Sequence, residues 1–377
     1  MAIISLMLMS EDVVLIGGAR TPFCEWLGGK RGDGEVGGRL ADVSAEQLGS
    51  IAIRGALEKT GTSPESVDHL VMGHALQTSD QAIFGARHAG LNAGIPQEVP
   101  MLTLNRLCGS GIQSIISASQ MIMLGEANTV VAGGMENLSQ APHVLRGMRS
   151  TYKLGRPPRE GDELPKDMED YLFTNLLDTT CDSFMAQTSD EICRRVGVTR
   201  EEADSFAVIS HSRTENSVDN GVWAEEIIDV ETADGLVTAT EEDHFVRGTS
   251  DESLGALRTH FGPTSLVTAG NASGVVDGAA AVVLKSSSQA ASDGDNPIAR
   301  IVNWGVVGLE PAIMAYGPVP ASKLALERAG MSVDEVDLWE INEAFAGQAV
   351  ACMKELGISH EIVNINGGAV GLGHPLA

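Results

Sequence analysis

The spacing of apolar residues alternates between the periods of strands and helices along the first part of the chain. Residues 13–17 are a short apolar run, as expected of a buried strand, and residues 67–72 are expected to form the next strand. Between them, residues 44–59 repeat apolar positions at helical intervals, with Ser44 in place for an N-cap and Gly61 for a stop. Strands that alternate with helices in this way predict the layers of an α/β fold.

One stretch combines this pattern with reactive chemistry. An apolar run from Leu102 ends at Cys108, Gly109 and Gly111 follow, and a weakly polar helical pattern continues to Leu124. This order predicts a strand, a sharp turn and a buried helix, with the cysteine at the turn. At a helix N-terminus a thiol faces free N–H groups and the positive end of the helix dipole, which favour the thiolate. Cys108 is therefore a candidate nucleophile; the alternative is a buried structural cysteine, which is common among free cysteines.

Two short patterns of the first half recur near the end of the chain. Residues 63–68 read Ser-Pro-Glu-Ser-Val-Asp and residues 332–337 read Ser-Val-Asp-Glu-Val-Asp, each after an amphipathic helix and before an apolar strand. Residues 105–109 and 364–368 both place an asparagine before a glycine-rich turn. Recurrence of both patterns in the same order predicts two copies of one α/β unit.

Composition narrows the class of protein. A chain of 377 residues with 43% hydrophobic residues and 43 glycines is typical of a two- or three-domain α/β protein, and no apolar run approaches a membrane span. The net charge of −26 argues against nucleic acid and anionic membranes as partners. The five cysteines have neither metal nor disulfide spacing, so we expect no metal site and a reducing cytoplasm. Six glycines within residues 28–38 predict a flexible loop, to which no role is assigned.

Five motifs, in this order, resemble those of the thiolases. The first surrounds Cys108, and the others cover residues 133–142, 268–274, 342–346 and 364–375. Each motif alone is a weak match, but together they span almost the whole chain. The resemblance implies the α/β thiolase fold, in which two similar βαβαβαββ-type halves pack in layers and the first half carries an inserted loop domain.

The resemblance also implies a domain organisation. It places an N-terminal half at 1–137, a loop domain at 138–275 and a C-terminal half at 276–377. The middle part is richer in charge and has helical patterns near 185–196 and 200–219. By comparison with the first copy, we expect the second copy to be incomplete, with its last helix and strand missing. The resemblance implies that this tail would carry a second catalytic cysteine.

Three residues receive catalytic roles from the same resemblance. Cys108 would carry the acyl group, and His374 would be the base that takes the proton of its thiol. Asn342 would hold a water at the oxyanion of the substrate thioester, to which protonated His374 also donates. The residues alone leave open that His374 is a capping or surface histidine and that Asn342 is a turn residue.

Coenzyme A (CoA) is expected as a substrate, with no permanently bound cofactor. The resemblance implies that Arg247 meets its nucleotide end and that Ser273 bonds its pantetheine arm. Six further contacts are implied along the tunnel and at the acyl end, namely Leu176, Phe261, Ala269, Met185, Met314 and Phe345. Each of these six is equally compatible with plain core packing.

The implied activity is acyl transfer. It is the thiolytic cleavage of 3-ketoacyl-CoA by CoA to acetyl-CoA and a shortened acyl-CoA, or the reverse Claisen condensation. Phe184 stands where biosynthetic acetoacetyl-CoA thiolases have a histidine, which favours a degradative role in fatty acid β-oxidation. Three alternatives stay open: an acetoacetyl-CoA-specific biosynthetic thiolase, a β-ketoacyl synthase, and a truncated CoA-binding product without full turnover. Because thiolases associate, we expect a cytoplasmic homodimer or homotetramer whose other partners are acyl-CoA and CoA.

Overall fold

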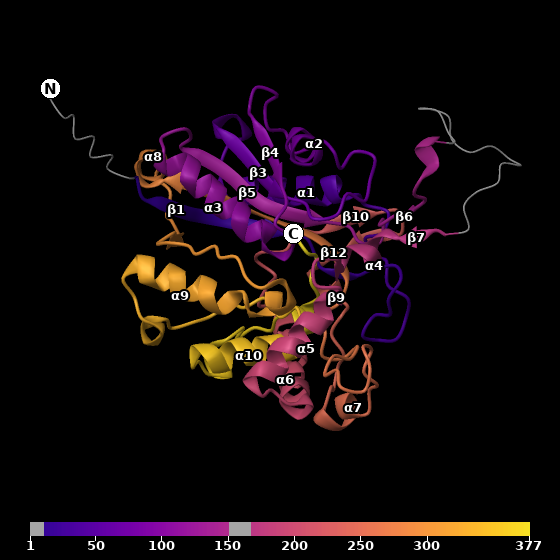
Figure 1. Ribbon diagram of the computed structural model, residues 1–377. Helices are drawn as coiled ribbons and strands as arrows, with labels where there is room; N and C mark the ends of the chain where they lie inside the picture. The colour runs from indigo at the N-terminus through magenta and orange to yellow at the C-terminus, as the bar shows by residue number, and fades with distance from the viewer. Residues whose placement is uncertain (1–10, 151–166) are drawn as a thin grey trace, which may run out of the picture.

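The computed structural model describes residues 11–150 and 167–377. Its elements form two layers, one above the other in Figure 1. The upper layer contains a large sheet, built mostly from the first part of the chain, with its helices, and the lower layer contains helices from the middle and the end. The C-terminus lies where the two layers meet (Figure 1), so segments far apart in the sequence come together at this boundary.

A seven-stranded sheet organises the upper layer of the described chain, with the order β13-β1-β12-β5-β3-β4 and with β2 beside β12. Strand β3 is parallel to β4 and β5, whereas β12 is antiparallel to β1 and β5. The strands predicted at 13–17 and 67–72 are confirmed as β1 and β3. The sheet consists of β1 (Val13–Arg20), β2 (Cys24–Glu25), β3 (His69–Gly73), β4 (Met101–Leu104), β5 (Thr129–Glu136), β12 (Val276–Ser286) and β13 (Ala299–Arg300).

Helices cover both faces of this sheet. Helix α1 contacts β1, β5 and β12 from one face, whereas α3 contacts β3 and β5 from the other. Helix α1 begins and ends as predicted, because Ser44 Oγ accepts the Gln47 N–H (3.3 Å) and Gly61 ends the helix with a φ of 63°. The helices of this layer are α1 (Ala45–Thr60), α2 (Gly85–Asn92), α3 (Ser110–Met123) and α8 (Ser287–Asp293).

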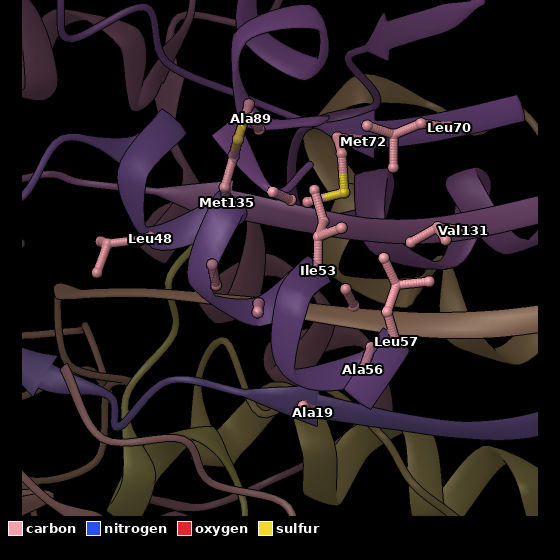
Figure 2. Close-up of a cluster of buried hydrophobic side chains, with 14 of the residues drawn as sticks. Ala19, Leu48, Ile53, Ala56, Leu57, Leu70, Met72, Ala89, Val131 and Met135 are labelled. Carbon is pink, nitrogen blue, oxygen red and sulfur yellow. The ribbon is translucent and has the colours of Figure 1, made fainter. Parts of the chain in front are cut away.

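The space between α1 and the sheet is filled by buried apolar side chains. Figure 2 shows Ile53 of α1 close to Met72 and Val131 of the sheet. Successive residues of β5 point to opposite faces, so Val131 packs towards α1 while Val130 and Ala132 pack towards α3. A strand buried on both faces reads as a continuous apolar run, which explains why β5 does not alternate in sequence.

The lower layer is a cluster of helices. Helix α10 packs on α5 and α6, and α6 also contacts α11. Ile192, Phe206 and Ala349 belong to the core that these helices share. The helices predicted at 185–196 and 200–219 are confirmed, and they pack against the end of the chain. The cluster consists of α5 (Met185–Val196), α6 (Arg200–Asp219), α9 (Pro318–Ala329), α10 (Ala346–Leu356) and the one-turn helix α11 (Ala369–Leu372).

The remaining elements are short. Within the glycine-rich loop at 28–38, Lys30 and Val36 form an isolated antiparallel bridge, and Gly34 supplies a φ of 87° for the turn. No helix in the described residues is long and apolar enough to cross a bilayer. The short elements are β6 (His143–Val144), β7 (Glu169–Asp170), α4 (Tyr171–Asn175), β8 (Leu177–Asp178), β9 (Ser183–Phe184), β10 (Val230–Thr232), β11 (Gly235–Val237) and α7 (Asp251–Gly255).

Strand β12 departs from the sequence analysis, which assigned residues from 276 onwards to the C-terminal half. It pairs with β1 and β5 inside the first sheet, with Ala281 opposite both Ala19 and Gly133. The apolar pattern of a strand does not specify its partner, which is decided by the sheet edges that the fold makes available. The second half contributes an isolated parallel bridge between Trp339 and Val363, which corresponds to the β3–β4 pairing of the first half.

Candidate active site

Cys108 lies in the turn between β4 and α3, as the sequence predicted, and it is exposed. Leu107 has a φ of 47°, in the left-handed region that residues other than glycine rarely adopt. Two hydrogen bonds hold this backbone: Asn105 Oδ1 accepts the Leu107 N–H (2.8 Å), and Ser110 Oγ accepts the Arg106 N–H (2.9 Å). A strained turn that its neighbours hold in place therefore presents the thiol.

The surroundings of Cys108 favour the neutral thiol. Desolvation by protein atoms, followed by the charge of Glu136, raises the pKa of Cys108 to about 11. Burial also raises the pKa of Glu136 to about 8, although the N–H groups of Ala75, Leu76 and Ala377 donate to its carboxyl oxygens. In the free protein this desolvation opposes the helix dipole that the sequence analysis expected to favour the thiolate. The thiol needs a base.

His374 and Asn342 supply a base and an amide donor. The Nδ2 atom of Asn342 lies 3.3 Å from Nε2 of His374. The backbone N–H of His374 donates to the Gly274 carbonyl (2.9 Å), which fixes the residue after α11. Desolvation lowers the pKa of His374 to about 4, so its imidazole is neutral at pH 7 and able to accept a proton.

One cavity of about 470 Å³ brings these three residues together. Cys108 belongs to the turn between β4 and α3 of the upper layer, whereas Asn342 precedes α10 and His374 follows α11 of the lower layer. Gly133 of β5 and Gly278 of β12 also line it. A nucleophile, a neutral base and a donor at one cavity are the components that acyl transfer requires.

Two family models match the chain: "Thiolase, N-terminal domain" over residues 13–288 and "Thiolase, C-terminal domain" over residues 295–377. The chain belongs to the thiolase family. The mitochondrial 3-ketoacyl-CoA thiolase of Homo sapiens is 41% identical over 372 residues, which are 98% of this chain and 89% of that protein. The acetyl-CoA acetyltransferase of Cupriavidus necator is 40% identical over 368 residues, covering 97% and 89% of the two chains.

Solved thiolase structures superpose closely. The human mitochondrial 3-ketoacyl-CoA thiolase in complex with CoA matches with a TM-score of 0.88 at 39% identity, over 98% of this chain and 88% of that one. The Bacillus anthracis acetyl-CoA acetyltransferase matches with a TM-score of 0.87 at 34% identity, over 97% and 89%. The α/β thiolase fold predicted from the motifs is confirmed.

The CoA candidates of this thiolase lie outside the described lining of the cavity, in two groups and two single positions. Ala269 and Ser273 belong to a segment that runs beside the Asn342 motif. The Ser273 N–H donates to the Ala344 carbonyl (3.0 Å), and Ala272 forms a β-bridge with Phe345. The structure thus places these candidates next to the motif that carries Asn342.

A second group surrounds the start of α5. The N–H of Met185 donates to the Leu176 carbonyl (3.1 Å). The ring of Phe184 lies 5.5 Å from the ring of Phe261 and 4.7 Å from that of Phe173. Phe184 stands where the sequence analysis noted the absence of a histidine. It is therefore part of an aromatic cluster that includes the predicted contact Phe261 and adjoins the predicted contact Met185.

The last two candidates are exposed. Arg247 forms ion pairs with Asp219 (2.9 Å) and Glu215 (3.1 Å), and its guanidinium lies over the Phe245 ring. Met314 is 39% exposed. A nucleotide phosphate would have to replace the carboxylates at Arg247, so the role of this residue stays a prediction.

Sequence reasoning missed Glu343, although it follows Asn342 directly. Its buried carboxyl accepts hydrogen bonds from Ser210 Oγ (2.6 Å), Asn364 Nδ2 (2.7 Å) and the Val370 N–H (3.0 Å). A Cβ at Gly368 would come within 2.2 Å of its Oε1, so the carboxyl fits only against a glycine. The signal in the sequence is its place directly after Asn342 and just before the apolar stretch that forms α10. In the described residues, no group of three or more His, Cys, Asp or Glu side chains is placed to hold a metal ion.

Proposed function

We propose that this thiolase is an acyltransferase that cleaves 3-ketoacyl-CoA with CoA to acetyl-CoA and a shortened acyl-CoA, through an acyl intermediate on Cys108. The same machinery can run the reverse Claisen condensation. The observation that carries the proposal is that Cys108, Asn342 and His374 line one cavity. The family membership of the chain supports it independently.

The first half-reaction starts at the thiol of Cys108. Nε2 of His374 takes the thiol proton while Sγ attacks the 3-keto carbon. The bond between C2 and C3 then breaks, its electron pair stays on C2, and C2 takes the proton that His374 received from the thiol, which gives acetyl-CoA and returns His374 to its neutral form. The acyl group remains on Cys108 as a thioester. Asn342 Nδ2, directly or through a water, and protonated His374 donate to the thioester oxygen that gains charge.

The second half-reaction restores the thiol. The sulfur of CoA attacks the carbonyl carbon of the acyl-Cys108 thioester, and a new carbon–sulfur bond replaces the bond to Sγ. The proton of the CoA thiol returns to Cys108 by way of His374. Because the neutral forms of Cys108 and His374 are favoured before substrate binds, no ion pair has to be broken when the cycle restarts.

We further propose a degradative role in fatty acid β-oxidation. The aromatic cluster of Phe173, Phe184 and Phe261 offers an apolar face beside Met185, where a longer acyl chain would gain about 0.8 kcal/mol per buried methylene. A histidine at 184 would present a polar edge there. The name of the human relative, a 3-ketoacyl-CoA thiolase, supports the same direction. All five cysteines are free, which suits a reducing cytoplasm.

A homodimer or a homotetramer is the proposed assembly. Strand β4 is an edge strand of the sheet, and edge strands pair readily with another chain. Leu102 on this strand is 42% exposed, and Leu107, Ile83 and Phe84 nearby are exposed as well. A second copy placed against β4 would cover this apolar surface next to the turn of Cys108.

Intact mass after exposure to acetyl-CoA tests the proposal. We expect the wild-type protein to gain one acetyl group and Cys108→Ala to gain none. Cys181→Ala is the matched control, since Cys181 is also free and partly exposed but lies away from the cavity lining; it should acylate like the wild type. An adduct that persists in Cys108→Ala would contradict the assignment of the nucleophile.

A further inference from the structure

One segment, residues 268–274, connects the two catalytic residues of the lower layer. On one side, the Ser273 N–H donates to the Ala344 carbonyl (3.0 Å), two residues after Asn342. At its end, the Gly274 carbonyl accepts the His374 N–H (2.9 Å). A shift of Gly274 would therefore move His374, whereas Ser273 has its own anchor.

The side chain of His244 packs directly against Gly274. A Cβ at position 274 would lie 2.3 Å from Nδ1 and Cε1 of this ring, so no side chain fits between them. Nδ1 of His244 pairs with the Glu25 carboxylate, and the two side chains are only 14% and 7% exposed. Glu25 in turn belongs to β2, where it pairs with Val276 of β12, two residues beyond Gly274. The ring is thus held between a carboxylate and the backbone that carries Gly274.

The charged and titratable groups around the Glu25–His244 pair have partners of their own. Asp243 Oδ1 accepts the Glu25 N–H (2.7 Å), and Asp243 Oδ2 lies 3.3 Å from Nε of Arg39. The ring of His211 on α6 lies 6.4 Å from that of His244. His211 accepts the Val246 N–H on Nδ1 (3.2 Å), and its Nε2 contacts the Gly270 carbonyl (3.3 Å). His211 therefore holds the start of the same segment, and His244 holds its end.

We propose that the Glu25–His244 pair is a positioning device for catalysis, which sets Gly274 and through it the imidazole of His374. Neither His244 nor Glu25 lines the cavity of Cys108, Asn342 and His374, so they act on the site through one backbone carbonyl. The inference rests on the proposed thiolase reaction. Because a displacement of about 1 Å in a catalytic group can cost up to about 100-fold in rate, a loosened Gly274 has a measurable effect.

The test is the thiolysis kinetics of His244→Ala and His244→Asn in the 377-residue protein. In His244→Ala we expect kcat to fall about 10-fold with the KM for CoA within about twofold, since Ser273 keeps its own hydrogen bond. The amide of His244→Asn can still donate to Glu25 and should recover most of this loss. His360→Ala, an exposed histidine away from the site, is the matched control and should leave kcat unchanged.

Further readouts keep the inference falsifiable. If His244→Ala does not fold, Glu25→Gln tests the same pair with a smaller change, and a kcat within twofold of wild type then overturns the inference. The inference is also overturned if kcat falls and the KM for CoA rises by similar factors, or if His244→Asn recovers none of the lost kcat. Either result indicates a general structural role. A wild type without thiolysis contradicts the proposed function instead. In that case the His374 ring signal in ¹⁵N-histidine NMR decides the inference: it must move in His244→Ala and stay in His360→Ala.

Discussion

Replacing Ser210 by alanine tests how the lower layer holds the catalytic histidine. Ser210 lies on α6 and is 2% exposed. Its Oγ donates to the Glu343 carboxylate (2.6 Å) and accepts the Gly371 N–H (3.1 Å). Helix α11 has only one turn, so its first N–H groups depend on such acceptors. The helix ends just before His374, so loosening it also affects the site.

The magnitude follows from the hydrogen bonds that Ser210→Ala removes. Burial raises the pKa of Glu343, so the hydrogen bond to its carboxyl is worth roughly 1 kcal/mol, and leaving the buried carboxyl oxygen without this donor costs roughly 1–2 kcal/mol more. The Gly371 N–H keeps a second acceptor, the Gly368 carbonyl (3.0 Å), so its share is smaller. We expect the free energy of unfolding to fall by about 2–3 kcal/mol. We also expect a lower kcat, because α11 and Glu343 flank His374 and Asn342.

Urea unfolding followed by circular dichroism measures this change, with Ser212→Ala as the control. Ser212 lies on the same helix but is exposed, so its substitution should change the free energy of unfolding by less than about 0.5 kcal/mol. A loss in Ser210→Ala no larger than in Ser212→Ala would refute the reasoning. It would mean that the Glu343 network relaxes around the missing hydroxyl without cost.

Four further outcomes are expected. The pKa values of His211 and His374 are lowered to about 4, whereas histidines in the unfolded chain take up protons near pH 6.5. The free energy of unfolding should therefore fall as the pH drops from about 6.5 to 4. Acid unfolding curves should record this fall, and a smaller one in His211→Gln. The charge of Glu136 raises the pKa of Cys108, and Glu136 ionises only near pH 8. Glu136→Gln should therefore speed alkylation of Cys108 at pH 9 but not at pH 7. Equal alkylation rates in the variant and the wild type at pH 9 would exclude this coupling. Longer 3-ketoacyl-CoA substrates should have a higher kcat/KM than acetoacetyl-CoA, and the opposite order would favour a biosynthetic role. Light scattering after size exclusion should give the mass of at least a dimer, and Leu102→Lys on β4 should shift it towards the monomer.

Much of the upper layer is predictable because its signals are local. The turn of Cys108 depends on hydrogen bonds between residues 105 and 110, and the helix after it follows from the apolar spacing. The caps of α1 are equally local, since Ser44 bonds within the first turn of its own helix. Such features are encoded in a few neighbouring residues, so they can be predicted without knowing where the remaining chain lies.

The membership of β12 and the contacts of Glu343 could not be predicted in the same way. Strand β12 lies between β1 and β5 in the first sheet, whereas its own apolar run would suit either half. Glu343 lies inside a motif, yet its partner Ser210 is on a helix from the middle of the chain. Spacing along the sequence says nothing about which distant polar groups will share a buried site.

By itself, the sequence determined the family, the order of strands and helices around the reactive cysteine, and the candidates Cys108, Asn342 and His374. The tertiary structure alone decided that these three share a cavity, that Cys108 and His374 are neutral at rest, and that Glu25 pairs with His244 behind Gly274. The physical reason is that desolvation and long-range hydrogen bonds depend on which surfaces come together when the two layers pack.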